Sequence, residues 1–195
     1  GNGSSIAAVK DGKVIDTTMG FTPLDGLIMG TRSGSIDPAI VTYIMDAEGL
    51  SAAEMDNLMN KKSGFLGVSG FSSDSRDLEN AIAAGPSDPN YETSNLAVNM
   101  LKHQIKKFIG SYSAIMNGLD AVVFTAGLGE NNPRLREIVC ENMEYFGIKI
   151  NKEVNAVTRD TAFISADDSS IPVAVIATNE ELAIARDTKS IVEKL

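Results

Sequence analysis

Residues 121–139 read AVVFTAGLGENNPRLREIV, an apolar run that stops at two glycines, two asparagines and a proline. This pattern predicts a strand over residues 121–125, a turn over 126–132 and a helix over 133–146. Asn132 suits the N-cap of that helix, and Pro133 suits its first position. Such a turn gathers backbone N–H groups and the positive end of a helix dipole, a combination that binds phosphate. A tight strand–helix connection without a ligand explains the glycine pair equally well.

Two common nucleotide-binding motifs do not fit this turn. A G-x-G-x-x-G motif starting at Gly127 needs glycine at position 132, where this chain has asparagine, and the next predicted strand, at 148–150, offers no acidic residue. A P-loop needs Gly-Lys followed by Ser or Thr, and this chain has none here. The other loops of the chain must therefore decide between a ligand site and a plain connection.

The composition is that of an acidic globular protein. Hydrophobic residues make up 43% of the 195 residues, and the formal net charge is −9. This charge argues against nucleic-acid binding through a general basic surface, so any phosphate must be bound locally. No apolar run approaches the ~20 residues of a membrane-spanning helix, and no signal peptide is evident, so we expect no membrane association. The single cysteine, Cys140, is expected to be buried, which fits a reducing cytoplasm.

Local signals predict a hairpin followed by alternating helices and strands. Asp11-Gly12 supplies a tight turn within a hairpin over 4–18, and Ser51 with Glu54 forms a capping box for a short helix. Residues 19–38 and 61–77 are rich in glycine and are expected to be loops. The other predicted elements are helices from Pro38, from about Asp74 to before Gly85, over 91–116 with burial on most sides, and from 180 to the end, and strands at 148–150 and 173–177. This order indicates a mixed α/β sheet.

Charged residues at three places in the chain are candidates for phosphate chemistry. Arg32 lies between two glycines; most such arginines are simply solvated, yet a planar guanidinium suits a transferring phosphoryl group. Asp74 and Arg76 are close enough for a surface ion pair, which by itself contributes little. Thr178 and Glu181 form a predicted capping box, which leaves Glu180 to support the helix dipole or to hold Mg²⁺.

Taken together, five strings resemble the acetate kinase family, and they occur in the family's order along the whole chain. The strings are GNGSSIAAVKDGK (1–13), DTTMGFTPLDGLIMGTRSGSIDPAI (16–40), SGFSSDSRD (69–77), DAVVFTAGLGENNPRLRE (120–137) and TNEELAIARDT (178–188). The resemblance implies a ribonuclease-H-like, actin-like ATPase domain of the acetate and sugar kinase superfamily, with a mixed sheet flanked by helices. It also implies reversible, Mg²⁺-dependent phosphoryl transfer between ATP and acetate, giving ADP and acetyl phosphate.

The resemblance assigns roles to individual residues. Arg32 matches the arginine that binds the acyl and phosphoryl groups, and Glu180 matches the magnesium-associated glutamate. The residues implied in nucleotide binding are Asn2, Gly3, Asp74, Ser75, Arg76, Gly127, Leu128, Gly129, Glu130 and Asn131. Ser35 departs from the aspartate that is common in the family, which should alter local bonding more than the reaction. His103, the only histidine, matches no family site and is interpreted as structural.

The resemblance also implies that residues 1–195 are the C-terminal nucleotide-binding domain of a longer enzyme, whose N-terminal half is absent. We therefore expect the chain alone to have negligible kinase activity. The helix from about 180 packs toward the N-terminal half in the family, so Leu182, Ile184, Ile191 and Val192 are expected to be exposed. A cytoplasmic homodimer is expected. Three alternatives stay open: a propionate kinase, a non-catalytic nucleotide-binding module of actin-like fold and, far less favoured, a dinucleotide-binding enzyme.

Overall fold

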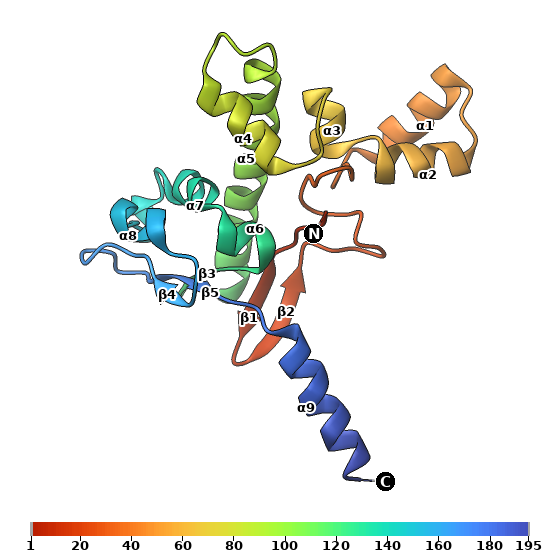
Figure 1. Ribbon diagram of the computed structural model, residues 1–195. Helices are drawn as coiled ribbons and strands as arrows, with labels where there is room; N and C mark the ends of the chain where they lie inside the picture. Colours follow the sequence, from red (N-terminus) through yellow and green to blue (C-terminus); the bar gives the residue numbers. More distant parts are fainter. Residues whose placement is uncertain (1, 195) are drawn as a thin grey trace. The chain divides into compact units, whose positions relative to one another are not determined.

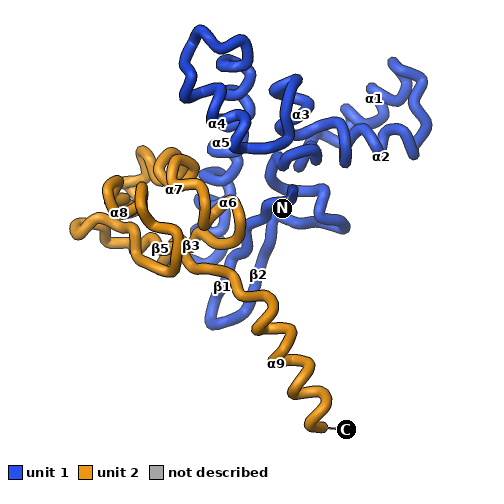
Figure 2. Tube along the Cα trace, viewed as in Figure 1, with its two compact units in different colours: residues 1–118 blue, residues 119–195 orange. Residues whose placement is uncertain are grey.

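The computed structural model describes residues 2–194, and the chain divides into two compact units, residues 1–118 (unit 1) and 119–195 (unit 2; Figure 2). Each unit has its own sheet and its own helices. The single nucleotide-binding domain over 1–195 stays a prediction. Across the described part of the chain, no helix has both the length and the apolar character needed to cross a bilayer.

Unit 1 begins with the predicted hairpin. Strands β1 (Ala7–Lys10) and β2 (Lys13–Thr17) pair antiparallel, with a register irregularity between Ala8 and Val9. Asp11 and Gly12 both have positive φ, 52° and 74°, as the tight turn predicted for this dipeptide requires. Helices α1 (Pro38–Glu48), α2 (Ala52–Lys61) and α4 (Ser75–Ala84) follow, at the predicted places.

Helix α5 (Tyr91–Met116) is the longest described helix of unit 1, and α3, α4 and β1 pack against it (Figure 1). Its apolar buried residues recur at helical spacing and form one stripe: Ala97, Leu101, Ile105, Ile109 and Tyr112. The expectation of burial on most sides was wrong, because Leu96 is 55% exposed and Met100 is 37% exposed. Helix α5 therefore has more apolar side chains than unit 1 buries.

Unit 2 is built on a three-stranded mixed sheet in the order β3-β5-β4. Strand β3 (Val122–Thr125) pairs parallel with β5 (Val173–Ile176), and β4 (Ala162–Phe163) pairs antiparallel with β5. The central strand carries the core, since Val173 and Val175 are fully buried. The remaining elements are α6 (Ala126–Asn131), α7 (Pro133–Cys140), the short 3₁₀ helix η1 (Glu144–Phe146), α8 (Lys152–Val157) and α9 (Glu180–Val192). The predicted α/β class with a mixed sheet is confirmed.

Several predicted boundaries were wrong for identifiable reasons. The loop expected over 61–77 contains α3 (Gly64–Ser69), and the turn expected over 126–132 contains α6. The helix expected over 133–146 ends at Cys140, because Glu141 is extended and Asn142 has a φ of 55°. Residues 148–150 make only isolated bridges, from Ile148 to Ile171 and from Ile150 to Ser165, so no continuous strand forms. Neither α8 nor β4 was expected.

Candidate functional site

In unit 1, the loop of residues 29–32 is held between the chain start and α3. The backbone N–H of Gly30 donates to the Asn2 carbonyl at 3.3 Å, and Asn2 Nδ2 donates to Thr31 Oγ1 at 2.8 Å. On the α3 side, the Phe65 N–H donates to the Met29 carbonyl at 2.8 Å. The loop therefore has a defined shape that depends on the predicted residue Asn2.

Two glycines allow this close packing. A Cβ at Gly30 would overlap the Asn2 amide oxygen and lie 2.8 Å from the Ser73 carbonyl oxygen. A Cβ at Gly3 would lie 3.0 Å from Arg32 Nη1. The segment that leads into Asp74, the chain start and the arginine loop thus meet at one place in unit 1. The predicted residues Asn2, Gly3 and Arg32 are brought together there.

The Arg32 guanidinium is half-buried and weakly engaged. Its Nη1 contacts the Pro23 carbonyl at 3.4 Å, which is long for a hydrogen bond, and the Met29 sulfur at 3.6 Å, a weak acceptor. Within residues 2–194 it takes part in no ion pair. Most of its donors are therefore open to a ligand oxyanion, and a side chain at position 3 would displace them.

Asp74 and Arg76 form the exposed ion pair that the sequence suggested. Asp74 is the N-cap of α4 and accepts from the Arg76 backbone N–H at 2.9 Å, while Arg76 Nη2 lies 2.5 Å from Asp74 Oδ2. The hydrogen bond from the Arg76 side chain, followed by the one from its backbone, lowers the pKa of Asp74 to about 2. Ser75 is the first residue of the helix. Because Arg76 is already paired with Asp74, it would have to share its donors with any ligand.

Ser35, interpreted from the resemblance as a departure from the family, bonds to two neighbouring residues in unit 1. Its hydroxyl donates to Asp25 Oδ1 at 2.5 Å and accepts from the Gly26 backbone N–H at 3.0 Å. An aspartate at this position would place a second carboxylate against Asp25. The Ser35 hydroxyl therefore joins Asp25 to the Gly26 backbone, and the expected change relative to an aspartate stays a prediction.

In unit 2, the loops that follow β3 and β5 lie at the same edge of the sheet. The strands are parallel and in register up to their last pair, Thr125 and Ile176. Thr125 Oγ1 also donates to the Ile176 carbonyl at 2.7 Å, which ties the two ends together. Ligands of open α/β sheets bind outside the carboxyl ends of parallel strands. The sheet therefore brings residues 126–131 and 177–180 to the edge where a ligand is expected.

The first of these segments, residues 126–131, is the short helix α6, here called the candidate nucleotide loop, and it starts with a strained residue. Ala126 has a φ of 58°, a left-handed conformation that costs a residue with a Cβ about 1–2 kcal/mol. Gly129 is buried against Phe124, and a Cβ there would lie 3.0 Å from the Phe124 carbonyl carbon. Asn131 Nδ2 donates back to the Gly127 carbonyl at 3.0 Å. Such strain persists where the surrounding structure enforces it, often at functional sites.

Glu130 joins this loop to the loop after β5. Its Oε1 accepts from both the backbone N–H and the hydroxyl of Thr178, each at 2.9 Å. The bond from the Thr178 backbone N–H is the main cause that lowers the pKa of Glu130. The predicted capping box of Thr178 and Glu181 was wrong: Asn179 is the N-cap of α9, and its side chain accepts from the Leu182 N–H at 3.0 Å. Thr178 is instead bound by Glu130.

Glu180 is the first residue of α9, two positions after Thr178, and is exposed. An exposed carboxylate beside a phosphate site is the usual protein share of a Mg²⁺ site, because Mg²⁺ keeps several waters and binds substrate phosphates. Within residues 2–194 no group of three or more His, Cys, Asp or Glu side chains is arranged to hold a metal by itself. Glu180 alone does not make a metal site, and its predicted role with Mg²⁺ stays a prediction.

One residue of unit 2 was missed by the sequence reasoning. Arg136 in α7 is fully buried, and its Nη1 donates to the carbonyls of Gly129 and Glu130 at 2.8 Å and 2.7 Å. A signal for it exists in the sequence, since Arg136 falls within the buried stripe of Leu135, Val139 and Cys140. A charged residue in an apolar stripe indicates a buried polar contact.

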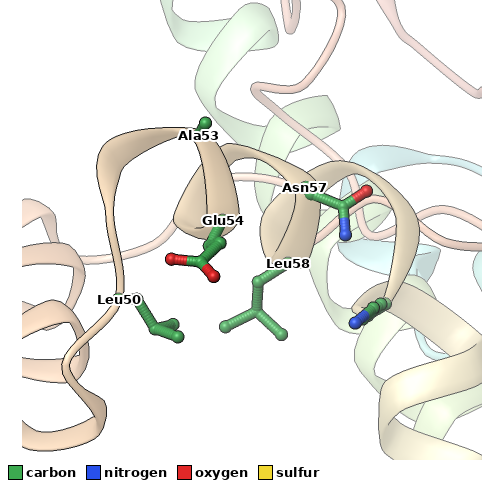
Figure 3. Close-up of a pocket in the computed structure, with 6 residues that line it drawn as sticks. Leu50, Ala53, Glu54, Asn57 and Leu58 are labelled. Carbon is green, nitrogen blue, oxygen red and sulfur yellow. The ribbon is translucent and has the colours of Figure 1, made fainter.

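An open pocket of about 410 Å³ lies beside α2 (Figure 3). It is lined by Leu50, Ala53, Glu54, Asn57, Leu58 and Lys62. None of the predicted site residues lines it, and its Glu54 is already engaged in the capping box with Ser51. The pocket therefore does not coincide with the candidate site, and His103, exposed on α5, lines no part of it either.

Comparison with known proteins identifies the family. The family model of the acetokinase family matches residues 1–186. An acetate kinase of Thermoanaerobacterium thermosaccharolyticum is 55% identical over 195 residues, which are 100% of this chain and 48% of that protein. The chain thus spans about half the length of the curated relatives it matches.

Solved structures agree with the sequence relatives. The crystal structure of Porphyromonas gingivalis acetate kinase matches with a TM-score of 0.91 and 49% identity, over 98% of this chain and 47% of that one. A propionate kinase from Francisella tularensis matches with a TM-score of 0.85 and 46% identity, over 94% of this chain and 46% of that one. On the sequence and the fold together, this chain belongs to the acetokinase family.

Proposed function

We propose that this chain supplies the nucleotide-binding half of an acetate kinase. The observation that carries the proposal is the pair of hydrogen bonds from Thr178 to Glu130, which joins the loop of residues 126–131 to the start of α9. Two motifs predicted to serve the nucleotide and its cation, 47 or more residues apart in the sequence, thereby lie at one edge of the sheet of unit 2. Family membership supports the same assignment.

In the proposed reaction, a carboxylate oxygen of acetate attacks the γ-phosphorus of ATP. The bond between that phosphorus and the β–γ bridging oxygen breaks, giving acetyl phosphate and ADP, and the reverse reaction makes ATP. Such a transfer depends on positioning and on neutralising the charge of the phosphoryl oxygens. We assign nucleotide-binding roles within each unit taken by itself: to Asn2, Gly3, Asp74, Ser75 and Arg76 in unit 1, and to residues 127–131 in unit 2.

Arg32 and Glu180 have the charged roles in this proposal. The weakly engaged Arg32 guanidinium binds the acyl and phosphoryl oxygens, because it has open donors and no ion-pair partner within residues 2–194. Glu180 would hold Mg²⁺, which supplies charge neutralisation at the β- and γ-phosphates when it is bound. The proposal assigns only Arg32 and Glu180 to the reacting groups and their cation, and the chain spans about half the length of its curated relatives, so we propose that the chain alone is inactive.

The test is to supply the other half. The chain is co-expressed with the N-terminal half of the Thermoanaerobacterium acetate kinase, and acetyl phosphate formation from ATP and acetate is measured for the complex and for the chain alone. We expect activity only in the complex. Robust activity of the chain alone would overturn the inactivity, and a folded complex without activity would overturn the acetate kinase assignment.

A propionate kinase is the second candidate, because one matched structure is a propionate kinase at a TM-score of 0.85. The ratio of kcat/KM values for acetate and propionate in the complex distinguishes the two. A non-catalytic nucleotide-binding module predicts that ADP–Mg²⁺ raises the Tm while the complex stays inactive. A dinucleotide-binding enzyme predicts a thermal shift with NAD instead of ADP–Mg²⁺.

We also propose a cytoplasmic homodimer. The single cysteine, Cys140, is buried, as suits a reducing compartment. In the described chain Leu182, Ile184, Ile191 and Val192 of α9 are 42–66% exposed, as expected for a helix that packs on a further segment. Light scattering gives the mass of the complex, and a clean monomer would contradict the dimer.

A further inference from the structure

Arg136 is a buried cation whose five N–H donors are all engaged. Nε donates to Asn155 Oδ1 at 2.7 Å, Nη1 donates to the carbonyls of Gly129 and Glu130, and Nη2 donates to the carbonyls of Asn155 and Thr158 at 2.9 Å and 3.1 Å. A guanidinium has five N–H groups, so none is left unsatisfied. The side chain is 0% exposed, and it takes part in no ion pair within residues 2–194.

The partners explain why the charge is tolerated without a carboxylate. Gly129 and Glu130 lie at the C-terminal end of α6 (Ala126–Asn131), while Asn155 and Thr158 lie at the C-terminal end of α8 (Lys152–Val157). The last carbonyls of a helix have no partner within it and carry the negative end of its dipole. Arg136 therefore satisfies two sets of such carbonyls at once. It holds α6 in place relative to α7 and α8.

The contact reaches the candidate nucleotide loop directly. The two carbonyls bound by Nη1 belong to residues of that loop, and Glu130 also binds Thr178 through its carboxylate. Gly129 is buried by the same packing. Movement of the guanidinium would break its hydrogen bonds to the carbonyls of Gly129 and Glu130. If Glu130 then moved, its bonds to Thr178, two residues before Glu180, would also be lost.

We infer that Arg136 is a positioning residue for the nucleotide: it fixes the backbone of residues 126–131 and, through Glu130, the start of α9. It does not touch the ligand. That the ligand is a nucleotide rests on the proposed function. That Arg136 fixes the loop rests only on its own hydrogen bonds.

The test uses Arg136→Lys and Arg136→Met in the co-expressed complex, with Arg134→Lys and Arg134→Met as matched controls. Arg134 lies on the same helix but is exposed. Hydrogen exchange of the amides of residues 126–131 is compared with that of β5, and the Kd of ADP–Mg²⁺ is measured with a fluorescent methylanthraniloyl-ADP probe.

For Arg136→Lys we expect faster exchange in 126–131, unchanged exchange in β5 and about tenfold weaker ADP–Mg²⁺ binding, since lysine keeps the charge but has three donors. We expect a larger loss for Arg136→Met and none for the Arg134 variants. If Arg136→Met does not fold, the lysine variant decides alone.

Three other outcomes would overturn the inference. Wild-type binding by Arg136→Lys would remove Arg136 from nucleotide positioning and leave the proposed function intact. Equal acceleration of exchange in β5 and in 126–131 would show a general structural role instead. A wild-type complex that does not bind ADP–Mg²⁺ would remove the proposed function and with it the nucleotide role, even where the loop exchange responds to Arg136.

Discussion

The loop of residues 29–32 in unit 1 and the loop of residues 126–131 in unit 2 use arginine in opposite ways. Arg136, in α7, is fully buried, and all its N–H groups donate to carbonyl oxygens of the protein. Two of these oxygens belong to the loop of residues 126–131. Arg32 lies within its loop, is half-buried and makes only contacts of 3.4 Å and 3.6 Å. The same side chain thus supports the backbone in one unit and is open to a ligand in the other.

The difference shows how local geometry separates a positioning role from a ligand-binding role. A saturated guanidinium cannot accept a new oxyanion without losing bonds it already has, and an unsaturated one gains bonds when an oxyanion arrives. In unit 1 the backbone of the loop is instead fixed by glycines and by Asn2.

The largest expected effect comes from Arg32→Ala. In the co-expressed complex we expect phosphoryl transfer to fall by ~10³-fold, because the group that neutralises the phosphoryl oxygens is lost. The free energy of unfolding should change by less than ~0.5 kcal/mol, since the replaced contacts are weak. Steady-state kinetics and urea unfolding measure the two quantities, with the exposed Arg134→Ala as control. Full activity of Arg32→Ala would show that Arg32 takes no part in the reaction. Arg32 and Arg136 would then no longer differ as a ligand-binding and a positioning residue.

The next effect concerns the backbone that holds the unit 1 loop. Gly64 has a φ of +64°, and a Cβ there would overlap the Met29 carbonyl oxygen and lie 2.8 Å from the Arg32 carbonyl oxygen. We expect Gly64→Ala to destabilise the chain by about 2–4 kcal/mol, from left-handed strain plus overpacking. Gly70 ends the same helix with a φ of +76° and has nothing within 4 Å, so Gly70→Ala should cost only about 1 kcal/mol.

Urea unfolding of the two alanine variants measures the difference. Equal destabilisation by Gly64→Ala and Gly70→Ala would mean that strain alone accounts for both. In that case the contact of Gly64 with residues 29–32 would not be what shapes the loop of Arg32.

The sequence predicted those features that depend on neighbouring residues. The Asp11-Gly12 turn, the capping box of Ser51 and Glu54, and the Asn132-Pro133 helix start are all present, because each is decided by two to four adjacent residues. The strands predicted at 121–125 and 173–177 are also present, over 122–125 and 173–176, because both are continuous apolar runs. These locally decided turns, helix starts and strands were sufficient to predict the α/β class.

Features decided by distant contacts were not predicted. Helix α3 starts at a glycine whose φ is set against residues 29–32, and α6 ends on carbonyls that Arg136 binds from another helix. Thr178 resembles an N-cap by spacing, but Glu130, 48 residues earlier, binds it instead. Most of the candidate residues came from family resemblance, whereas the partners of Arg136 and the bond from Thr178 to Glu130 are visible only in the structure.

A smaller effect is expected at the start of the unit 2 loop. Ala126 has a φ of 58°, which glycine adopts without a steric penalty. We expect Ala126→Gly to stabilise the chain by up to about 1 kcal/mol, the relief of strain being partly offset by the extra freedom of glycine in the unfolded state. Thermal unfolding measures this shift. Destabilisation would show that the left-handed backbone of Ala126 is not strained. Backbone strain could then be compared with Gly64→Ala in unit 1 only.

The smallest expected effect compares one carboxylate from each unit. Arg76 lowers the pKa of Asp74 to about 2 from 3.8, and Thr178 lowers the pKa of Glu130 from 4.5. A carboxylate whose pKa is lower in the folded state stabilises that state above its unfolded pKa, and this contribution is lost as the pH falls toward the folded pKa. The stability advantage of wild type over Asp74→Asn should therefore disappear between pH 3.8 and about 2. Asparagine keeps the helix cap, so the variant isolates the charge.

The stability advantage of wild type over Glu130→Gln should decline at higher pH than the advantage over Asp74→Asn, starting near 4.5. Urea unfolding from pH 6 to 2, with NMR titration of both carboxyl groups, measures the two windows. If Glu130 titrated at its unfolded value, its bonds to Thr178 would not persist in solution, and the link from the nucleotide loop to α9 would be lost.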